Sequence, residues 1–600
     1  MKELDASVVK TLRAYNSKNL AFMREVIYIT QSCDDECVMW LALGIPMLGM
    51  APPARGLMDR VQPPDATIGE WMADTHSRNL SLLPRLGPSG DETLDTVAYE
   101  KSMEEVTAGV LDGPYDDLDD VPLELPCLVP RHGIWEQHGD AEEPSVRIID
   151  DLLMGEQNTT TGTLSSHRPT DVDGLVAQAR VVATAFRTKL NVWKSDFSKA
   201  FKQIPGDPSQ RGRIVIGQWS PCRGRTVFFV ASSQLFGSKG APLNFSRFPA
   251  ACCQWMACLF AVAMSHCVDD VISLERALTA ASGRDCWLRF AELCGWKISR
   301  EKSPPPCDHM PVIGVMLDLR SLPDGNAFVA VTKKRLQALE ASIRSVLLSN
   351  TLGSGYAAAL AGKLSFTITA AFGRLVRARI RPIIRRAYSN VKRLGFQLVA
   401  CLSWWLRFLR TYDVRPIPSN LQGIPTVISY SDGEGRDAGV GAAVWVPWLQ
   451  HPLAAFTHVP PEIRELWSYH TGSEGGRDIF MIEAVGPLLL LLAFPRIFRS
   501  VLWIHFIDNT AAEASLISGS SSLDVADHIV GLTWEKCCKR RVWPYFDRVS
   551  SKSNPVDLLS RGDKRGPWRG VKEVAFPIDE IEDLASECGG WLCIQNIVGD

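Results

Sequence analysis

The spacing of hydrophobic and polar residues changes along the chain and predicts where strands and helices lie. From residue 146 onward, short apolar runs divided by Gly, Pro and Asp predict strands at 192–197, 213–217 and 226–231. Residues 244–264 carry few helix breakers and predict a buried helix, whereas residues 267–274 predict a tight hairpin around two adjacent aspartates. The pattern is that of a mixed α/β region.

A second pattern begins at residue 333. Residues 333–348 and 357–384 have apolar positions spaced near 3.6 residues, which predicts two helices. From residue 427, two alternating runs around a Gly-rich turn predict a pair of strands. The elements predicted after this pair are a helix at 479–493, a strand at 501–507, helices at 511–517 and 523–539, and a strand at 541–549. This order predicts a further mixed α/β domain of about 140 residues.

Length and composition limit the class of protein. The chain has 600 residues, which suggests about four domains. Its 46% hydrophobic and 22% charged residues are typical of globular proteins and exclude wholesale disorder. No apolar stretch is a convincing membrane span, the first ten residues do not resemble a secretory signal, and the 16 cysteines show no disulfide framework. We expect an intracellular protein of the cytoplasm or nucleus, not secreted and with no membrane partner.

The net charge of −3 hides an uneven distribution. Residues 1–150 hold 12 basic and 27 acidic side chains, and the acidic run at 112–120 is expected to be a solvated loop. Residues 321–420 hold 16 basic and 3 acidic side chains. This basic stretch is a candidate nucleic-acid surface, because Lys and Arg contacts to phosphates release counterions, although a solvated helical face is the plainer alternative. Four of its arginines recur at helical spacing and are the candidate contacts: Arg374, Arg377, Arg381 and Arg385.

Three aspartates form a first candidate site. Asp196 ends a predicted strand, and Asp269 and Asp270 are adjacent in the predicted hairpin. Adjacent strand residues point to opposite faces, so at most one of the pair is expected to share a face with Asp196 unless the turn redirects the other. Carboxylates from neighbouring strands can hold two divalent metal ions, and Mg²⁺ suits such oxygen ligands. Taken alone, an Asp-Asp pair is more often an ordinary turn.

The surrounding sequence resembles the palm of reverse transcriptases over about residues 100–400. The matching motifs follow in collinear order at 146–151, 194–205, 236–242, 267–270, 295–298 with 301–303, 312–315 and 360–366. Each motif alone is weak, but together their order and spacing are specific. One departure is Cys267, which stands where the family usually has Tyr or Phe.

The resemblance implies catalytic roles for the aspartates and two basic residues. Asp196 and Asp269 would bind two Mg²⁺ or Mn²⁺ ions, and Asp270 would support the same metal site. Arg147 and Lys302 would contact the triphosphate of the incoming nucleotide.

The resemblance also implies roles for three residues that shape the nucleotide site. Phe236 and Gly237 belong to the motif that positions template and nucleotide. Phe201 matches an aromatic gate whose ring would clash with a ribose 2′-hydroxyl, which favours deoxynucleotides. A core Phe behind the active strand is the alternative for Phe201.

Four acids at the ends or interiors of apolar elements form a second candidate site: Asp432, Glu483, Asp508 and Asp557. An acid within an apolar helix, such as Glu483, is costly unless it is paired or bound to metal. If these acids converge at one sheet edge, they suit two-metal phosphodiester hydrolysis. Their order resembles the RNase H family over about residues 425–562, which implies that all four are catalytic metal ligands. Residues 550–554 lack the His that many family members carry before the last Asp.

These resemblances imply a multidomain protein of α/β and α+β class. A right-hand polymerase of fingers, palm and thumb would precede an RNase H-like domain. The expected boundaries are an N-terminal region of unknown role at 1–95, fingers and palm at 96–320, a basic helical thumb and connection at 321–424, the RNase H-like domain at 425–565, and a tail at 566–600.

The implied function is that of a retrotransposon RNA-directed DNA polymerase with RNase H activity. Its partners would be an RNA template, a DNA primer or RNA–DNA hybrid, and dNTPs. Residues 104–115 and 551–561 are most similar to DIRS-like elements. A decayed or domesticated copy that binds nucleic acid without catalysis is the alternative, and an RNA-dependent RNA polymerase is disfavoured by Phe201. The sequence leaves the oligomeric state open.

Overall fold

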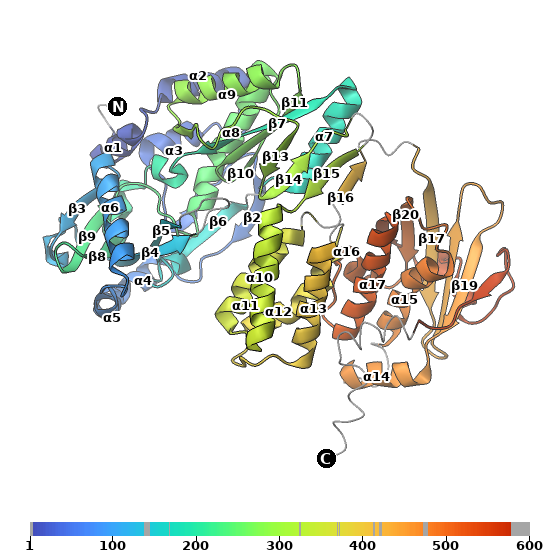
Figure 1. Ribbon diagram of the computed structural model, residues 1–600. Coiled ribbons are helices and arrows are strands. Elements are labelled where there is room, and N and C mark those ends of the chain that lie inside the picture. The colour runs from blue at the N-terminus through green and yellow to red at the C-terminus, as the bar shows by residue number, and fades with distance from the viewer. Residues whose placement is uncertain are drawn as a thin grey trace, which may run out of the picture. The chain divides into compact units, whose positions relative to one another are not determined.

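The computed structural model describes residues 4–136, 144–166, 169–322, 326–368, 370, 373–411, 415–418, 423–471 and 478–577. The chain divides into two compact units, one of Met1–Ile313 with Leu317–Ala327 and one of Gly314–Met316 with the chain from Phe328 onward. Both units mix helices and strands, as expected for a multidomain α/β protein (Figure 1). Among the described residues, no helix is both long and apolar enough to cross a membrane.

Two sheets form one side of the first unit. Their strand orders are β3-β9-β8-β4-β5 and β1-β6-β2. The strands are β1 (Gly49–Ala51), β2 (Met58–Gln62), β3 (Leu111–Tyr115), β4 (Leu128–Glu136), β5 (Ser145–Asp150), β6 (Thr161–Ser166), β8 (Val215–Ser220) and β9 (Arg225–Ala231). Helix α6 (Glu92–Ala108) packs on β4, β5 and β8, and α4 (Ile68–Ala73) and α5 (Thr75–Leu82) precede it. The Asp91 side chain caps α6 by accepting a hydrogen bond from the Leu94 amide.

The acidic run at 112–120 is the predicted solvated loop only in its second half, since residues 112–115 belong to a strand and residues 116–120 are largely exposed outside it. It contributes β3, which pairs with β9. Its carboxylates form ion pairs that involve Asp112 with Lys10 and Arg211, Asp116 with Arg223, and Asp117 with Arg225. Strand pairing outweighs the turn preference only in the first half of the run, whereas residues 116–120 keep it.

A four-stranded sheet with the order β10-β11-β7-β12 forms the centre of the first unit. Its strands are β7 (Leu190–Phe197), β10 (Met264–Cys267), β11 (Asp270–Arg276) and β12 (Ile298–Ser299). Helices α7 (Val172–Phe186), α8 (Ala241–Phe260) and α9 (Ala280–Cys294) pack around it. The predicted strand at 192–197 and the hairpin are confirmed. The predicted helix at 244–264 instead ends at Phe260, because the next residues enter the sheet as β10.

The first three helices belong to the core of the first unit. They are α1 (Ala6–Ala14), α2 (Leu20–Thr30) and α3 (Cys37–Leu43). Buried Leu12, Met23 and Val38 lie in the same hydrophobic cluster as Trp193 of β7 and Phe245 of α8. Figure 1 shows α2 beside α9, with which it is in contact. The segment whose role the sequence leaves open therefore helps to build the support of the central sheet.

The second unit begins with helices α10 (Lys333–Ser349), α11 (Ser354–Ile368), α12 (Arg377–Ala387) and α13 (Phe396–Thr411). The helix predicted at 333–348 is confirmed as α10. The single helix predicted at 357–384 is wrong, because this segment forms the separate helices α11 and α12. A turn at 373–376 precedes α12, and Gly373 adopts a φ of +56° there, which is incompatible with a continuous right-handed helix.

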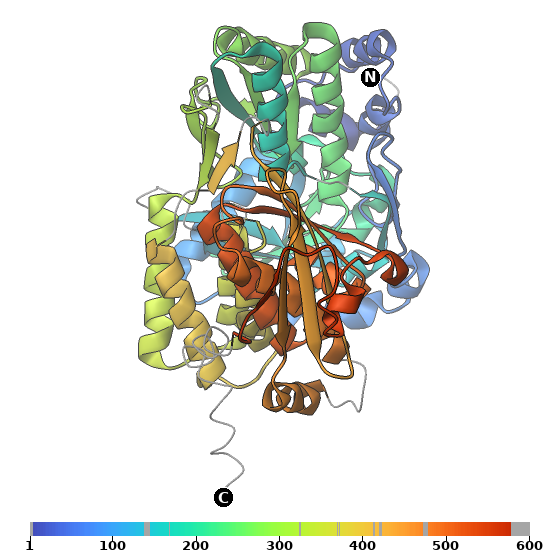
Figure 2. The ribbon, with the colours of Figure 1, turned by 90° about the vertical axis from the view of Figure 1, so that its right-hand side faces the viewer.

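The second unit also contains a six-stranded sheet with the order β21-β20-β17-β18-β19-β22 (Figure 2). Its strands are β17 (Thr426–Gly433), β18 (Gly439–Trp445), β19 (Leu453–His458), β20 (Leu502–Ile507), β21 (Trp543–Arg548) and β22 (Val571–Glu573). Its helices are α14 (Pro461–Thr471), α15 (Asp478–Ala493), α16 (Thr510–Ser518), α17 (Asp524–Arg540) and α18 (Asp557–Ser560). The elements predicted from residue 427 to 549 are confirmed, whereas β19, α14 and β22 were not predicted. The remaining strands of the described chain are β13 (His309–Val312), which belongs to the first unit, β14 (Val315–Asp318), β15 (Asn326–Ala330) and β16 (Arg415–Pro418).

A buried lysine joins the N-terminal segment to the central sheet. Lys18 Nζ donates hydrogen bonds to Gln203 Oε1 at 3.0 Å and to the Gly295 carbonyl at 2.8 Å, and it lies 4.8 Å from the Trp296 ring centre. Gln203 in turn donates to the Ser198 carbonyl at 2.8 Å, directly after β7. Burial lowers the pKa of Lys18 to about 7.

Replacing this lysine is expected to change how stability depends on pH. The pKa of Lys18 is about 7 in the folded chain and about 10.4 in an unfolded chain, so the unfolded chain binds more protons between these values. The unfolding free energy of the wild type, relative to Lys18→Met, should therefore rise with pH from 7 to 10, by up to about 1.4 kcal/mol per pH unit. Pulse proteolysis in urea at several pH values measures this difference, and a flat difference would contradict it.

Candidate functional site

The register of the central sheet brings the first three aspartates together. Asp196 on β7 pairs directly with Asp270 on β11, and residues paired directly across two antiparallel strands point to the same face. Asp269 lies in the turn, after Val268 with a φ of +55°, and its carbonyl accepts a hydrogen bond from the Phe197 amide at 3.0 Å. The turn therefore lets Asp269 and Asp196 line one pocket, while Asp270 faces Asp196 across the strands.

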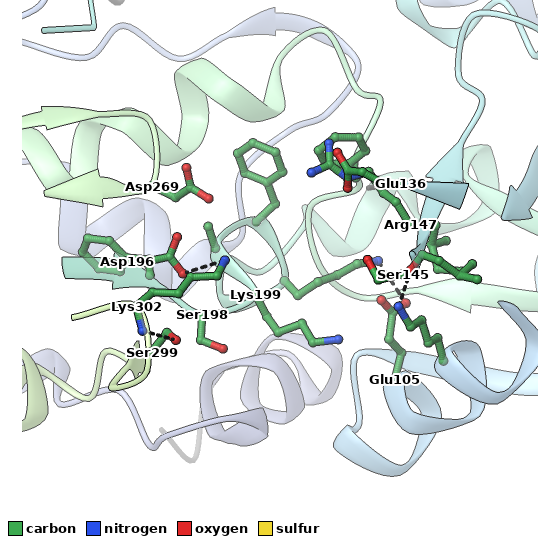
Figure 3. A pocket seen from close by; sticks show the side chains of 18 of the residues that line it. Glu105, Glu136, Ser145, Arg147, Asp196, Ser198, Lys199, Asp269, Ser299 and Lys302 are labelled. Atoms are coloured by element: carbon green, nitrogen blue, oxygen red, sulfur yellow. Dashed lines mark hydrogen bonds and ion pairs between the residues drawn. The ribbon is translucent and has the colours of Figure 1, made fainter. Parts of the chain in front are cut away.

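The pKa values of all three aspartates are raised. Burial and the charges of Asp269 and Asp196 raise the pKa of Asp270 to about 6. Burial also raises the pKa of Asp196 and of Asp269, and the nearby Lys302 opposes both shifts. Lys302 Nζ lies 3.4 Å from Asp196 Oδ2, the ion pair drawn in Figure 3. Buried carboxylates with raised pKa values in a cleft are typical of functional sites.

The pocket has a volume of about 480 Å³ and contains residues of both charges. Besides the two aspartates, four predicted residues line the pocket: Arg147, Phe201, Phe236 and Lys302. Arg147 forms an ion pair with Glu136, with 2.7 Å between Nε and Oε2, and its guanidinium lies 5.2 Å from the Phe236 ring centre. Figure 3 shows the carboxylates of Asp196 and Asp269 at one side of this pocket and Arg147 at the other.

Phe201 is held by other aromatic rings. Its ring centre lies 6.1 Å from that of Phe236 and 5.7 Å from that of Phe245. Gly237 follows Phe236 with a φ of +110°, and its carbonyl accepts a hydrogen bond from Asn158 Nδ2 at 3.0 Å. A side chain on Gly237 would overlap the Asp150 carbonyl, so the residue serves close backbone packing at the pocket wall.

Sequence reasoning missed a buried charge network that supports the pocket. Arg131 donates to Asp150 at 2.6 Å and to Glu105 at 3.0 Å, and Lys202 Nζ lies 3.1 Å from Glu105 Oε2. Burial alone would raise the pKa of Glu105, but the charges of Lys202 and Arg131 outweigh it and lower the pKa to about 2. Lys202 and Asp150 belong to segments that matched the polymerase motifs, but those matches gave them no role. Lys101 and Lys199 also line the pocket and were missed.

Three acids of the second unit form a compact group. Asp432 ends β17, Glu483 lies in α15, and Asp508 follows β20; each offers an oxygen atom, and these atoms lie within 4.8 Å of one another. In the described part of the chain, no other group of three or more potential ligands meets this condition. The parallel pairing of β17 with β20 places the two strand ends side by side.

The pKa values of two of these acids, Glu483 and Asp432, are raised. Burial and the neighbouring charges of Asp432 and Asp508 raise the pKa of Glu483 to about 10. Burial, opposed by a hydrogen bond from Ser560, raises the pKa of Asp432 to about 6. Glu483 Oε2 is buried and has no hydrogen-bond partner among the described residues. An all-oxygen donor set with an unsatisfied buried oxygen fits a hard divalent cation such as Mg²⁺ or Mn²⁺.

The structure does not bring Asp557 into this group. Asp557 is the first residue of α18, and its Oδ1 accepts a hydrogen bond from Arg561 Nη2, one helical turn away, at 2.9 Å. The sequence predicts a fourth metal ligand at this position, and this stays a prediction: Asp557 is paired with Arg561, yet its charge helps to raise the pKa of Asp432.

The four predicted nucleic-acid arginines do not form one open face. Arg381 pairs with Asp527 of α17 at 3.1 Å and donates to the Ser521 carbonyl, and Arg377 donates to the Ser518 carbonyl at 3.5 Å. Arg374 packs closely against Gly519. Only Arg385 of the four is exposed. The helical spacing of the arginines was predicted, but periodicity does not distinguish a face that meets solvent from one that meets α16 and α17.

The comparison with solved structures finds foamy viral proteins. The foamy viral protease-reverse transcriptase dRH in complex with double-stranded DNA is 12% identical, with a TM-score of 0.40, over 88% of this chain and 81% of its own. The foamy viral protease-reverse transcriptase in complex with double-stranded DNA is 12% identical, with a TM-score of 0.39, over 91% and 98%. The same protein in complex with an RNA/DNA hybrid is 13% identical, with a TM-score of 0.40, over 91% and 64%.

No protein-family model matches this chain, and no curated protein sequence matches it. At these identities and TM-scores the structural likeness decides neither the fold nor the activity. The chemistry is therefore inferred from the two carboxylate groups.

The contacts of α12 predict different effects for two arginines of the same helix. Arg381→Ala should destabilise the chain, and a double-mutant cycle with Asp527→Ala should give a coupling energy of roughly 0.5–3 kcal/mol. Arg385→Ala, at an exposed position of the same helix, should lower stability less than Arg381→Ala and should reduce the salt dependence of binding to an RNA–DNA hybrid. Urea unfolding and a salt titration of hybrid binding measure the two effects. Zero coupling for the Arg381–Asp527 pair would contradict the structural assignment.

Proposed function

We propose that this chain is a retrotransposon RNA-directed DNA polymerase that also degrades the RNA strand of the RNA–DNA hybrid it makes. The observation that carries the proposal is the presence of two separate carboxylate groups, each gathered at strand ends in a way that suits divalent metal ions. The collinear reverse transcriptase and RNase H motifs support it. A DIRS-like origin is part of the proposal and rests on sequence resemblance alone.

The first pocket would carry out nucleotidyl transfer. Asp196 and Asp269 would hold two Mg²⁺ or Mn²⁺ ions, which supply charge neutralisation and Lewis-acid activation there. Asp270, opposite Asp196, would add negative charge behind them. Lys302 and Arg147 would bind the triphosphate of a dNTP. To do so, Arg147 would exchange its contact with Glu136 for a phosphate oxygen. The primer 3′-hydroxyl would then attack the α-phosphorus in line, and pyrophosphate would leave.

The second group would carry out RNA hydrolysis. Asp432, Glu483 and Asp508 would hold the divalent ions, which supply an activated water and stabilise the leaving oxygen. Because Glu483 has a strongly raised pKa in the absence of a cation, its carboxylate gains most from a nearby positive charge. Asp557 would contribute only from a greater distance, since it is paired with Arg561.

The proposed domain roles follow from these sites. The first unit would contain the fingers and palm, with α1 to α3 bracing the palm. In the second unit, α10 to α13 would form the thumb and connection, and the six-stranded sheet with its helices would form the RNase H-like domain. The two activities form one reaction sequence, because copying RNA into DNA produces the hybrid that the nuclease consumes.

Single substitutions should separate the two activities. Asp269→Asn should lower dNTP extension on an RNA template by roughly 10³-fold or more, because it removes a charged ligand from the transfer site, while cleavage of a preformed hybrid continues. Asp508→Asn should do the reverse. A primer-extension assay with a labelled RNA strand measures both reactions at once. The proposal would be wrong if each variant retained both activities.

Phe201 should decide the choice between deoxynucleotides and ribonucleotides. Phe201→Ala should raise the relative use of rNTPs by roughly 100-fold, because removal of the ring leaves room for a 2′-hydroxyl. Phe201→Tyr keeps the ring and is the matched control. Steady-state extension with dNTP and rNTP pairs gives the ratio of kcat/KM values. Equal ratios for wild type and Phe201→Ala would place the ring outside the nucleotide site.

A further inference from the structure

Two neutral side chains of the second unit, Ser560 and Asn554, donate hydrogen bonds to the buried carboxylate of Asp432. Ser560 Oγ is hydrogen-bonded to Asp432 Oδ2, and Asn554 Nδ2 lies 3.4 Å from Asp432 Oδ1. Asn554 Nδ2 also donates to the Ser431 carbonyl at 2.9 Å, which fixes it to the strand that carries Asp432. All of these groups are buried. The orientation of Asp432 is therefore set from both of its oxygens.

The position of Ser560 is itself fixed by packing. Val556 and Leu559 lie in one apolar cluster with Ala443 of β18 and Ala454 of β19, which seats α18 on the sheet. The backbone of α18 lies against β18 at Gly441, where a Cβ would be only 2.6 Å from the Ser560 amide nitrogen. Gly441 pairs directly with Asp432 across β17 and β18. The close approach that glycine allows therefore brings Ser560 onto Asp432.

The hydroxyl of Ser560 has only one proton for two nearby acceptors. Its Oγ lies 2.7 Å from the Asp557 carbonyl as well as next to Asp432. An ionised Asp432 is the stronger acceptor, because hydrogen bonds to charged groups exceed those to neutral ones in strength. The hydroxyl is thus held in place by α18 and available to the carboxylate.

We propose that Ser560 is a positioning residue that holds Asp432 in the orientation needed to share a divalent cation with Glu483 and Asp508. This inference rests on the proposed nuclease function of the same group. Without the hydroxyl, Asp432 would lose the hydrogen bond that fixes its Oδ2, and repulsion from Asp508 would favour other rotamers. Asn554 alone would then restrain it, through a contact of 3.4 Å. Residues that orient metal ligands in this way contribute typically 10–100-fold to metal affinity or activity.

The first test measures hybrid cleavage as a function of Mg²⁺ concentration in the full chain. Ser560→Ala should raise the half-saturating Mg²⁺ concentration about 10-fold, and Ser560→Thr, which keeps the hydroxyl, should recover most of this loss. Ser551→Ala is the matched control, since Ser551 lies exposed in the turn before Asn554. Primer extension by the same variants should stay unchanged, which shows that the chain is folded. An unchanged Mg²⁺ dependence for Ser560→Ala would overturn the inference.

The second test does not depend on cleavage. Mn²⁺ binding is followed by electron paramagnetic resonance in an Asp196→Asn/Asp269→Asn background, which leaves the second carboxylate group as the main site. Addition of Ser560→Ala should weaken binding about 10-fold, and equal affinity would overturn the inference. If the wild type bound Mn²⁺ in a Ser560-dependent way but cleaved no hybrid, the proposed nuclease function would fail while the positioning role stood.

Discussion

Repulsion between carboxylates held at strand ends is the constraint on which both candidate sites depend. Asp196 and Asp270 face each other because the register of β7 and β11 leaves them no alternative. Asp432 and Asp508 meet because β17 and β20 run parallel and end together. These acids are therefore carried by packed strands, and the apolar surface that the strands bury stabilises the fold against the repulsion between the carboxylates. Burial, together with this repulsion, raises the pKa values of Asp270 and Asp432 to about 6 and that of Glu483 to about 10.

Other buried charges of the first unit are paired with opposite charges. Arg131 pairs with Asp150 and Glu105, and Arg247 makes two hydrogen bonds of 2.8 Å to Asp34. These pairs satisfy the rule that a buried charge needs a close opposite charge. The two carboxylate groups follow this rule only in part, because Asp270 and the buried Glu483 lie beside other acids and have raised pKa values. Glu105, Asp150 and Lys202 of the Arg131 network line the same pocket as Asp196 and Asp269, so paired and crowded charges occur in one cavity.

The sequence allowed prediction of elements whose pattern is local. Strand β7, the hairpin at Asp269 and Asp270, and most elements from β17 to β21, though not β19 or α14, follow from alternation, helical spacing and turn residues. The acids that these elements carry follow from the same pattern. Features that depend on distant partners could not be predicted in this way. The roles of α1 to α3 depend on packing against α8 and α9, the break between α11 and α12 depends on one glycine conformation, and Arg381 meets Asp527 only in the folded chain. Asp557 was assigned by motif, but its neighbour Arg561 takes up the carboxylate.

The two sites also differ in how their negative charge is balanced, and this difference fits different substrates. Asp196 has a lysine ammonium 3.4 Å away, in a pocket that further basic residues line. Such a site can accept an additional polyanion, because cations are already present to meet a triphosphate. Asp432 is instead held by a hydroxyl and an amide, which orient it without neutralising it. Neutral donors leave the negative charge of Asp432 available to a metal ion, as the proposed hydrolytic function requires.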